Sequence, residues 1–299
     1  MSRLALSPIA PVLGQRVPVR GPARMLFRSY AKAARHPGDA AMQLTTAVGD
    51  RFEVDLASYL EWHLWVFGSF EPHFAELFRH LVKPGDRCVD VGANVGVHTI
   101  RLAKLVGPDG AVTAVEPDPE LARRIHENVQ LNEMTNVRVI QAAAADRSAT
   151  ALLYRPGAAD ANRARASLLH HAYLTGQAQE VPTVTIDELR PGPVALIKID
   201  VEGAEAGVVA GAADTIVKDL PAVIFEYAPD ALGHEVTSPF GWLADQGYEM
   251  LLIRFRRNKV TGRGGLALRR LARLPDRDSN ILAVPPALAA RVSSLVTRA

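Results

Sequence analysis

The chain has 299 residues, of which 48% are hydrophobic and 22% charged, a composition typical of a globular protein with one large domain or two small ones. No apolar run approaches the roughly 18 residues that would cross a bilayer, so no transmembrane segment is predicted. The only cysteine, Cys88, lies inside an apolar run. A disulfide framework is therefore excluded, and we expect a buried thiol in a reducing, cytoplasmic protein.

The net charge of +2 is unevenly distributed. Residues 1–38 contain seven Lys/Arg and no acid, and residues 254–277 contain nine Lys/Arg against Asp276 alone. Subtracting these charges of +7 and +8 from the total leaves about −13 for the rest of the chain. We expect a mildly acidic body with two basic appendages: an N-terminal tail over 1–45 and an insertion over 256–278. The tail is either a solvated extension or a targeting or membrane-surface segment, and it lacks the apolar core of a secretory signal.

Hydrophobic periodicity predicts the elements in chain order. A short helix is expected near 23–34, strand-like and aromatic residues follow over 50–67, and a helix is expected over 72–81. Strands and amphipathic helices then alternate: strand 88–92, helix 95–106, strand 111–115, helix 118–131 and strand 137–141. This alternation predicts an α/β fold with a parallel sheet and helices on both faces.

The second half repeats the alternation after an irregular section over 142–192, which contains short strand candidates at 150–154 and 181–186. The later elements are strand 194–200, helix 204–216, strand 221–227, helix 238–246, strand 248–255 and strand 280–284. Because no helix is expected between the last two strands, they predict an antiparallel hairpin at the edge of the sheet. We expect one domain over 46–286 and a C-terminal helix over 287–299.

Residues 89–97 read as a buried strand, a glycine turn and the first turn of a helix. A dinucleotide fingerprint would need glycines where this chain has Asn94 and Val97. Gly92 and Gly96 instead form a G-x-x-x-G turn, which favours a sulfonium nucleoside with an amino-acid tail over a diphosphate.

Three acids after the glycine turn are candidates for specific roles. Glu116 comes 24 residues after Gly92, near the spacing at which a carboxylate meets a ribose diol, although it can also cap the next helix. We assign ribose binding to Glu116 and capping to Asp118. Asp146 follows the third strand and either accepts a hydrogen bond from an adenine amino group or forms a turn.

Four motifs occur in order: G-x-x-E at 68–71, V-D-V-G-A-N-V-G at 89–96, V-P-T-V-T-I-D at 181–187 and I-K-I-D-V-E-G-A-E at 197–205. Together they resemble the FkbM family of S-adenosylmethionine-dependent methyltransferases over roughly residues 50–285. The resemblance implies a Rossmann-like, seven-stranded methyltransferase sheet, mostly parallel, with the last strand inserted antiparallel. It also implies methylation, mostly at oxygen, of small molecules or sugars.

The resemblance further implies which residues hold the cofactor, S-adenosylmethionine. Four positions of the glycine turn would hold its methionine portion: Asp90, Gly92, Asn94 and Gly96. Glu116 would hold the ribose and Asp146 the adenine. Glu71 either receives the ammonium group of the cofactor or caps the helix that begins at Pro72.

Carboxylates gather where the fourth strand ends, at the rim of the expected crevice. Asp200 or Glu202 is the expected general base that takes the proton from a substrate hydroxyl. Binding of a divalent metal by Asp200, Glu202 and Glu226 is the alternative, but no metal site is predicted. Glu205 is expected to favour the N-terminus of the following helix, and Lys198 is expected to reach the surface.

The sequence indicates the methyl acceptor less clearly than the methyl donor. The fourth strand ends in D-V-E-G rather than in the Asn/Asp-Pro-Pro-aromatic motif of many base methyltransferases. The basic region over 254–277 is either a solvated loop or a contact for an anionic partner such as a nucleotide sugar, an acidic glycan or a lipid-linked glycan. We expect an O-methyltransferase acting on a small molecule, saccharide or glycan intermediate, and no duplex nucleic acid partner. An RNA methyltransferase and a non-catalytic cofactor-binding scaffold are the alternatives.

Overall fold

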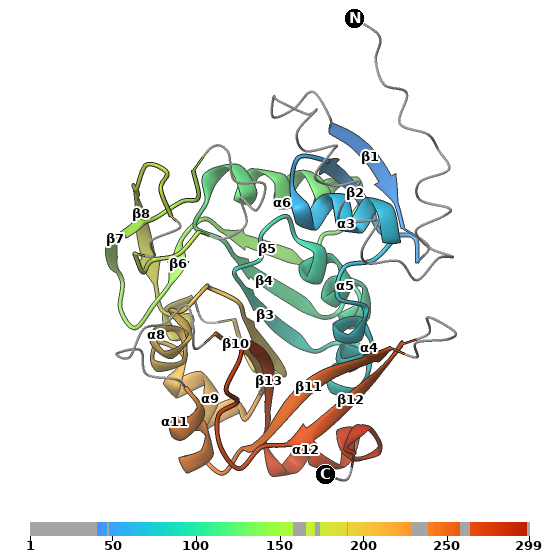
Figure 1. The fold of residues 1–299 in the computed structure, drawn as a ribbon, viewed down its shortest axis with the longest axis vertical. Coiled ribbons are helices and arrows are strands. Elements are labelled where there is room, and N and C mark those ends of the chain that lie inside the picture. The colour runs from blue at the N-terminus through green and yellow to red at the C-terminus, as the bar shows by residue number, and fades with distance from the viewer. Residues whose placement is uncertain are drawn as a thin grey trace, which may run out of the picture.

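The structure is a computed structural model that describes residues 41–46, 48–157, 166–170, 174–189, 191–228, 239–257 and 264–297. The helix expected near 23–34 lies outside these residues. Within them, the central sheet has eight strands in the order β5 (Val137–Ile140), β4 (Ala111–Val115), β3 (Arg87–Val91), β9 (Leu196–Ile199), β10 (Ala222–Tyr227), β13 (Ser279–Val284), β11 (Glu249–Arg257) and β12 (Gly264–Arg270) (Figure 1). The strands from β5 to β10 pair in parallel, and β13 is antiparallel to both of its neighbours. The Rossmann-like fold with an inserted antiparallel strand is therefore confirmed.

The sheet has one strand more than expected, because β12 lies inside the region predicted as a basic insertion. The antiparallel pairing expected of the last two predicted strands is confirmed by β11 and β13, but β12 pairs antiparallel with the other side of β11 and forms the edge of the sheet. Leu266 and Leu268 of β12 are buried in the core, while Arg269 and Arg270 follow directly. The apolar alternation is thus too short, and too close to arginines, to stand out in the sequence.

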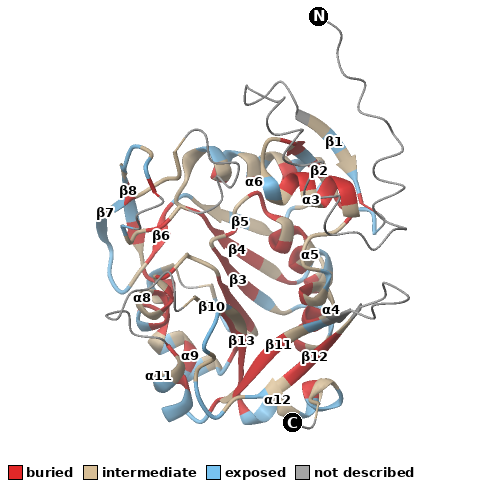
Figure 2. Ribbon diagram, in the orientation of Figure 1, coloured by how far each residue is buried: buried red, intermediate tan, exposed pale blue. Residues whose placement is uncertain are grey.

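Helices cover both faces of the sheet, as expected for parallel strands. One face packs against α4 (Pro72–Leu81), α5 (Val97–Val106), α6 (Pro119–Leu131) and α12 (Pro286–Val292). The other packs against α7 (Ile186–Leu189), α8 (Glu205–Ala210), α9 (Ala213–Asp219) and α11 (Phe240–Asp245). Figure 2 shows that the strands at the centre of the sheet are buried, and Cys88 is among their buried residues.

The helix expected over 204–216 is two short helices, α8 and α9. The break falls at Gly211, where an added Cβ would lie only 1.9 Å from the carbonyl oxygen of Ala145. This close approach of two backbone segments requires a glycine, and the chain bends there. Neither the contact nor the bend can be inferred from helical periodicity, because Ala145 belongs to a distant part of the sequence.

A separate three-stranded sheet, in the order β6 (Ala143–Ala144), β8 (Gln179–Val184) and β7 (Ala149–Leu153), forms much of the section expected to be irregular. Both short strand candidates in that section are confirmed. At the other end of the described chain, α12 is followed by the 3-10 helix η2 (Ser293–Leu295). Among the described residues, no helix combines the length and the apolar character needed to cross a membrane.

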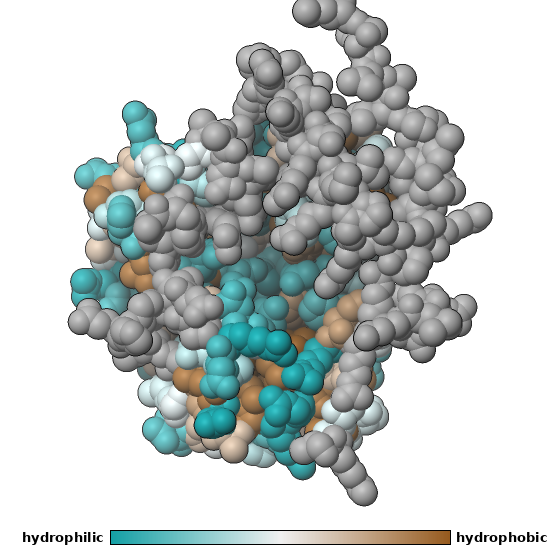
Figure 3. Space-filling model, viewed as in Figure 1, coloured by the Kyte–Doolittle hydropathy of each residue, from teal (hydrophilic) through white to brown (hydrophobic). Residues whose placement is uncertain are grey.

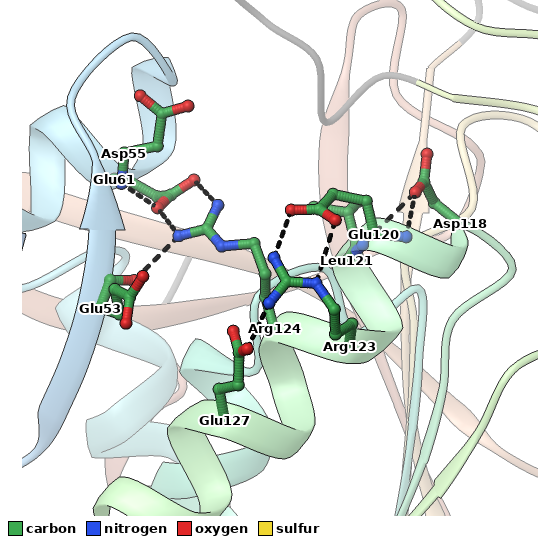
Figure 4. Close-up of polar contacts among 9 residues, drawn as sticks. All are labelled: Glu53, Asp55, Glu61, Asp118, Glu120, Leu121, Arg123, Arg124 and Glu127. Atoms are coloured by element: carbon green, nitrogen blue, oxygen red, sulfur yellow. Dashed lines mark hydrogen bonds and ion pairs between the residues drawn. The ribbon is translucent and has the colours of Figure 1, made fainter. Parts of the chain in front are cut away.

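An N-terminal unit packs beside α6. It consists of the hairpin β1 (Ala41–Thr45) and β2 (Arg51–Asp55) and the helix α3 (Tyr59–Phe67), so β1 begins inside the stretch expected to be a tail. Figure 4 shows Arg124 reaching from α6 to this unit. Its Nη1 donates to Oε1 of Glu61 at 2.7 Å, and its Nη2 donates to the carbonyl oxygen of Glu53 at 2.8 Å. Because Glu61 is only 1% exposed, this ion pair fixes α3 against α6.

Helix α6 begins directly after Asp118, the predicted N-cap. The Asp118 carboxylate accepts hydrogen bonds from the backbone N–H groups of Glu120 at 2.8 Å and Leu121 at 3.3 Å. Pro119 occupies the first position of the helix, where its missing N–H costs nothing. The capping role of Asp118 therefore agrees with the structure, and it fixes the chain that immediately follows Glu116.

Candidate functional site

A cavity opens at the carboxyl ends of the parallel strands, where the sheet order changes direction between β3 and β9. The four central strands each contribute to its lining: Gly92 follows β3, Glu116 follows β4, Asp200 follows β9, and Glu226 lies near the end of β10. Further lining comes from outside the sheet: Tyr59, Leu60, Phe70, Ala143, Ala144 and Leu153. The cavity is thus formed jointly by the sheet, the N-terminal unit and the small three-stranded sheet.

The glycine turn lets two strand ends meet at the base of the cavity. Gly92 has a φ of +70°, and a Cβ at this position would lie 1.8 Å from the carbonyl oxygen of Asp200. Asn94 also has a positive φ, of 55°. Its backbone N–H donates to Oε2 of Glu116 at 2.8 Å. The turn therefore requires a glycine at Gly92 and is joined directly to the acid that ends the neighbouring strand.

Glu116 is held firmly while it lines the cavity. Its Oε1 accepts from the backbone N–H of Asp118 at 3.0 Å, in addition to the Oε2 bond from Asn94. The residue is 5% exposed, and burial raises the pKa of its carboxyl group to about 7. Because an ionised carboxylate offers about four acceptor positions, two remain for a ligand with two hydroxyl donors.

Asp90 and Gly96 do not line the cavity. Asp90 is completely buried behind its wall, where Oδ2 accepts from Oγ1 of Thr99 at 2.6 Å. Gly96 is the N-cap of α5, and an added Cβ would lie 3.4 Å from a methyl carbon of Ile125 on α6. Both residues shape the turn from behind the cavity wall, and the cofactor contact expected of them stays a prediction.

Asp146 lies outside the cavity. Its side chain is 54% exposed, and its nearest cation is Arg147, at 3.7 Å. The chain reaches the cavity three residues earlier, because Ala143 and Ala144 pair with β8 and line the wall. The cavity wall on this side is formed by Ala143 and Ala144, which carry no recognisable polar signal, and the adenine contact of Asp146 stays a prediction.

Lys198 is buried rather than at the surface, which corrects our expectation. Its side chain is 4% exposed, and Nζ lies 3.6 Å from Oδ1 of Asp90 and 3.2 Å from Oδ2 of Asp200. Burial alone would lower the pKa of Lys198, but the carboxylates of Asp200 and Asp90 outweigh it and raise that pKa. The ammonium group of Lys198 thus links Asp200, which follows β9, to Asp90 on β3.

Glu71 is the N-cap of α4, yet its side chain makes no capping hydrogen bond. Oε2 instead lies 3.1 Å from Nε2 of His98, whose ring packs against Phe74 and Phe78. Burial raises the pKa of Glu71, but the hydrogen bond to His98 and the positive charges of His98, His73 and Lys198 together outweigh burial, and the pKa lies below its ordinary value. Both Glu71 and His98 line the cavity, so the carboxylate is directed to the site and not to the helix end.

Backbone strain concentrates around the cavity. Among the described residues, five that are not glycine have a positive φ: Glu71, Asn94, Glu133, Glu202 and Leu220. Three of these line the cavity: Glu71, Asn94 and Glu202. Conformations of this kind cost free energy and persist where the surrounding structure enforces them, most often at functional sites.

The carboxylates near the ends of β9 and β10, which we call the acidic cluster, divide into two groups. Asp200, Glu202 and Glu226 line the cavity, whereas Oε1 of Glu205 accepts from the backbone N–H of Gly203 at 3.1 Å and supports the turn before α8. Burial first, and then the neighbouring carboxylates, raise the pKa of Glu226 to about 9. Within the described ranges, no group of three His, Cys, Asp or Glu side chains could hold a metal ion.

Comparisons with known proteins find a family model and several similar chains. The family model described as the methyltransferase FkbM domain matches residues 90–250. A protein-L-isoaspartate O-methyltransferase of Ignicoccus hospitalis is 27% identical over 121 residues, which are 40% of this chain and 50% of that protein. The enzyme of the same name from Aeropyrum pernix is 32% identical over 118 residues, 39% of this chain and 40% of its own. The chain thus spans half the length or less of these curated relatives.

Among solved structures, a methyltransferase FkbM from Methylobacillus flagellatus KT is similar to 74% of this chain and 52% of its own, with 13% identity and a TM-score of 0.43.

Proposed function

The chain belongs to the FkbM family of methyltransferases, whose cofactor is S-adenosylmethionine, and from this premise we propose that it methylates a hydroxyl group of a saccharide or another small molecule. The observation that carries the proposal is the cavity itself. Glu116 is held there with acceptor positions to spare, and the carboxylates of Asp200 and Glu226 line the same cavity at the ends of β9 and β10, beyond the intervening β3.

The residues present fit this cofactor. Glu116 would accept hydrogen bonds from the ribose hydroxyls, and the turn at Gly92 and Asn94 would hold the methionine portion. Glu71 would receive the ammonium group, because its carboxylate is directed into the cavity by His98. The cofactor is a cation, so the excess of carboxylates over Lys198 in the lining favours its binding. When bound, it supplies an electrophilic methyl group on a sulfonium.

Asp200 is the residue we assign as general base. Lys198 holds its Oδ2, which leaves Oδ1 for the proton of an acceptor hydroxyl. Asp200 would take up that proton as the acceptor oxygen receives the methyl group that the bound cofactor would supply. The side chain of Asp200 is 42% exposed, so solvent can take the proton afterwards. Alignment of donor and acceptor supplies the rest of the rate enhancement.

Calorimetry with S-adenosylmethionine and with NAD tests the cofactor class, and transfer of a methyl label to a panel of sugars, glycans and RNA tests the acceptor. We expect binding of S-adenosylmethionine alone and label on a saccharide or small-molecule hydroxyl. Absence of S-adenosylmethionine binding would overturn the proposal. Label on RNA but on no saccharide or small molecule would contradict the acceptor class.

Single substitutions separate the two candidate bases. Asp200→Asn is expected to lower kcat by at least about 100-fold, the lower range for loss of general-base catalysis, with the Kd for S-adenosylmethionine within about twofold. Glu202→Gln is the matched control, since it removes one charge from the same cavity, and its kcat should fall by less than about fivefold. Steady-state kinetics with the labelled acceptor measures both. Unchanged turnover in both variants would reject a carboxylate base in this cluster.

Cofactor affinity is expected to rise with pH between about 6 and 9. Burial raises the pKa of Glu116 to about 7 and that of Glu226 to about 9, so both cavity groups are largely protonated below these values. A cationic ligand favours their ionised forms, and its binding therefore releases protons. Titration calorimetry at pH 7 in two buffers of different ionisation enthalpy measures that release. Glu116→Gln should remove the part of the pH dependence centred near pH 7, and an unchanged profile in this variant would contradict the assignment.

The free energy of unfolding of the cofactor-free protein should fall as pH rises, whereas cofactor affinity should increase. Both pKa values exceed the ordinary value of 4.5, so the folded state holds protons that the unfolded state has lost. Their contribution to the free energy of unfolding is complete below pH 4.5 and is lost as pH rises through about 7 and then 9.

A further inference from the structure

A second groove lies on the part of the sheet formed by β11 and β12. Five arginines line it, and we call it the arginine groove: Arg254, Arg269, Arg270, Arg273 and Arg277. Asp276 is the one carboxylate among the described residues in its lining. Figure 3 shows strongly hydrophilic side chains gathered over β11 and the segment from β12 to β13, with hydrophobic side chains between them. That segment is anchored, because Leu271 and Leu274 pack against the core.

Most of these arginines lack an acidic partner. Arg270 pairs with Glu249 beside it. Arg254, Arg269, Arg273 and Arg277 form no ion pair with any residue that the structure describes. In addition, Nε of Arg269 is buried without a hydrogen-bond partner among those residues. A buried guanidinium N–H is costly to leave unpaired, so an acceptor oxygen bound in the groove would compensate it.

The arginine groove and the cavity open at the same edge of the sheet. Tyr227, which follows Glu226, is paired with Ser279 of β13. On the other side of β13, Leu252 of β11 is paired with Ile281, and extending this register by two residues brings Arg254 level with Ser279. Arg254 is therefore two strands from Tyr227, a separation of roughly 10 Å. A single ligand of the size of a disaccharide or nucleotide can reach both.

The two sites have opposite charge. Among the described residues, the cavity is lined by five carboxylates and one lysine, whereas the arginine groove is lined by five arginines and one carboxylate. An anionic group would be repelled from the cavity and attracted to the groove. Guanidinium groups bind phosphate oxygens in bidentate geometry, and several unpaired arginines favour a multiply charged anion over a single carboxylate.

We propose that the arginine groove binds a phosphate or diphosphate group carried by the methyl acceptor, while the hydroxyl to be methylated enters the acidic cavity. This inference rests on the proposed function and deepens it. The acceptor is then a phosphate-bearing saccharide, and its anionic and reacting ends are recognised by separate parts of one sheet edge.

The test measures binding of uridine diphosphate and inorganic pyrophosphate by calorimetry in the full chain at 0.15 M salt. Arg273→Ala/Arg277→Ala, in the exposed part of the groove, should weaken binding at least tenfold, and Arg269→Lys should weaken it by loss of bidentate geometry. Arg79→Ala/Arg147→Ala removes the same charge from exposed positions outside the groove and should change the affinity less than twofold. The Kd for S-adenosylmethionine should stay within twofold in every variant.

A second arm uses flotation with vesicles that contain phosphatidylglycerol, and distinguishes a lipid-borne phosphate from a soluble one. Loss of vesicle binding in the groove variants but not in the control would place the phosphate on a lipid carrier and support the proposal. No binding of either diphosphate or of vesicles, or equal losses in groove and control variants, would overturn it. Failure of S-adenosylmethionine to bind would instead overturn the proposed function, because the diphosphate measurement is made without cofactor.

Discussion

Replacing Gly92 with alanine is expected to abolish detectable cofactor binding, with a loss of affinity of at least about 100-fold. The added Cβ would lie 1.8 Å from the carbonyl oxygen of Asp200, a distance that no side chain tolerates, and the other atom of the contact is backbone. The ends of β3 and β9 must then separate, which displaces Asn94 and its bond to Glu116. Calorimetry with S-adenosylmethionine and thermal unfolding measure the two consequences.

Gly85→Ala is the matched control. Gly85 has a φ of +86°, similar to the +70° of Gly92, but an added Cβ would meet nothing within 4 Å. This variant carries the backbone cost of a positive φ, about 1–2 kcal/mol, without the collision. It should retain the cofactor affinity of the unmodified chain. If Gly92→Ala bound the cofactor as well as Gly85→Ala does, the close approach of the two strand ends would not be needed for the site.

Removal of Lys198 is expected to have the second large effect. Lys198→Met should lower the free energy of unfolding by about 3–5 kcal/mol, because it leaves a buried charge without its counter-ion. Asp90 is completely buried, and among the described residues its Oδ1 accepts no hydrogen bond, so the ammonium group 3.6 Å away is what balances it. Urea denaturation at pH 7 measures the change.

The double variant Asp90→Asn/Lys198→Met isolates the pair. It removes both charges, so it should recover more than half of the stability lost in Lys198→Met. Additive losses in the double variant would show that the two groups act independently. Asp200, which is 42% exposed on its side chain, is solvated and does not need the same compensation.

Much of the fold follows from local patterns, and the errors come from long-range contacts. The strand ending in Asp90 and the helix over 72–81 agree with the structure because each is set by its own apolar periodicity. Lys198 was misplaced because its apolar strand gives no sign of the buried Asp90 beside it. The pairing of Ala143 and Ala144 with β8, which brings the chain into the cavity wall before Asp146, gives no local signal in the sequence either.

In the candidate site, too, local patterns could be predicted from the sequence and long-range contacts could not. The turn at Gly92 and the acid at Glu116 could be inferred from spacing, because both lie directly after strands of one parallel sheet. Tyr59, Ala143 and Ala144 line the same cavity without any motif. Glu226 was considered only as a metal ligand, although its position at the end of a central strand was sufficient to place it in the crevice.

The ion pair between Arg124 and Glu61 has a consequence for where this protein can be divided. It attaches α3 to α6, and α3 supplies Tyr59 and Leu60 to the cavity. The matched residues 90–250 leave out α3 and also α4, β12, β13 and α12, which pack in the core, so a fragment trimmed to that range would lose part of the cavity wall and part of the core beneath it. The smallest unit able to enclose a ligand therefore begins before the family match, to include α3, and extends beyond it, to include β13 of the central sheet.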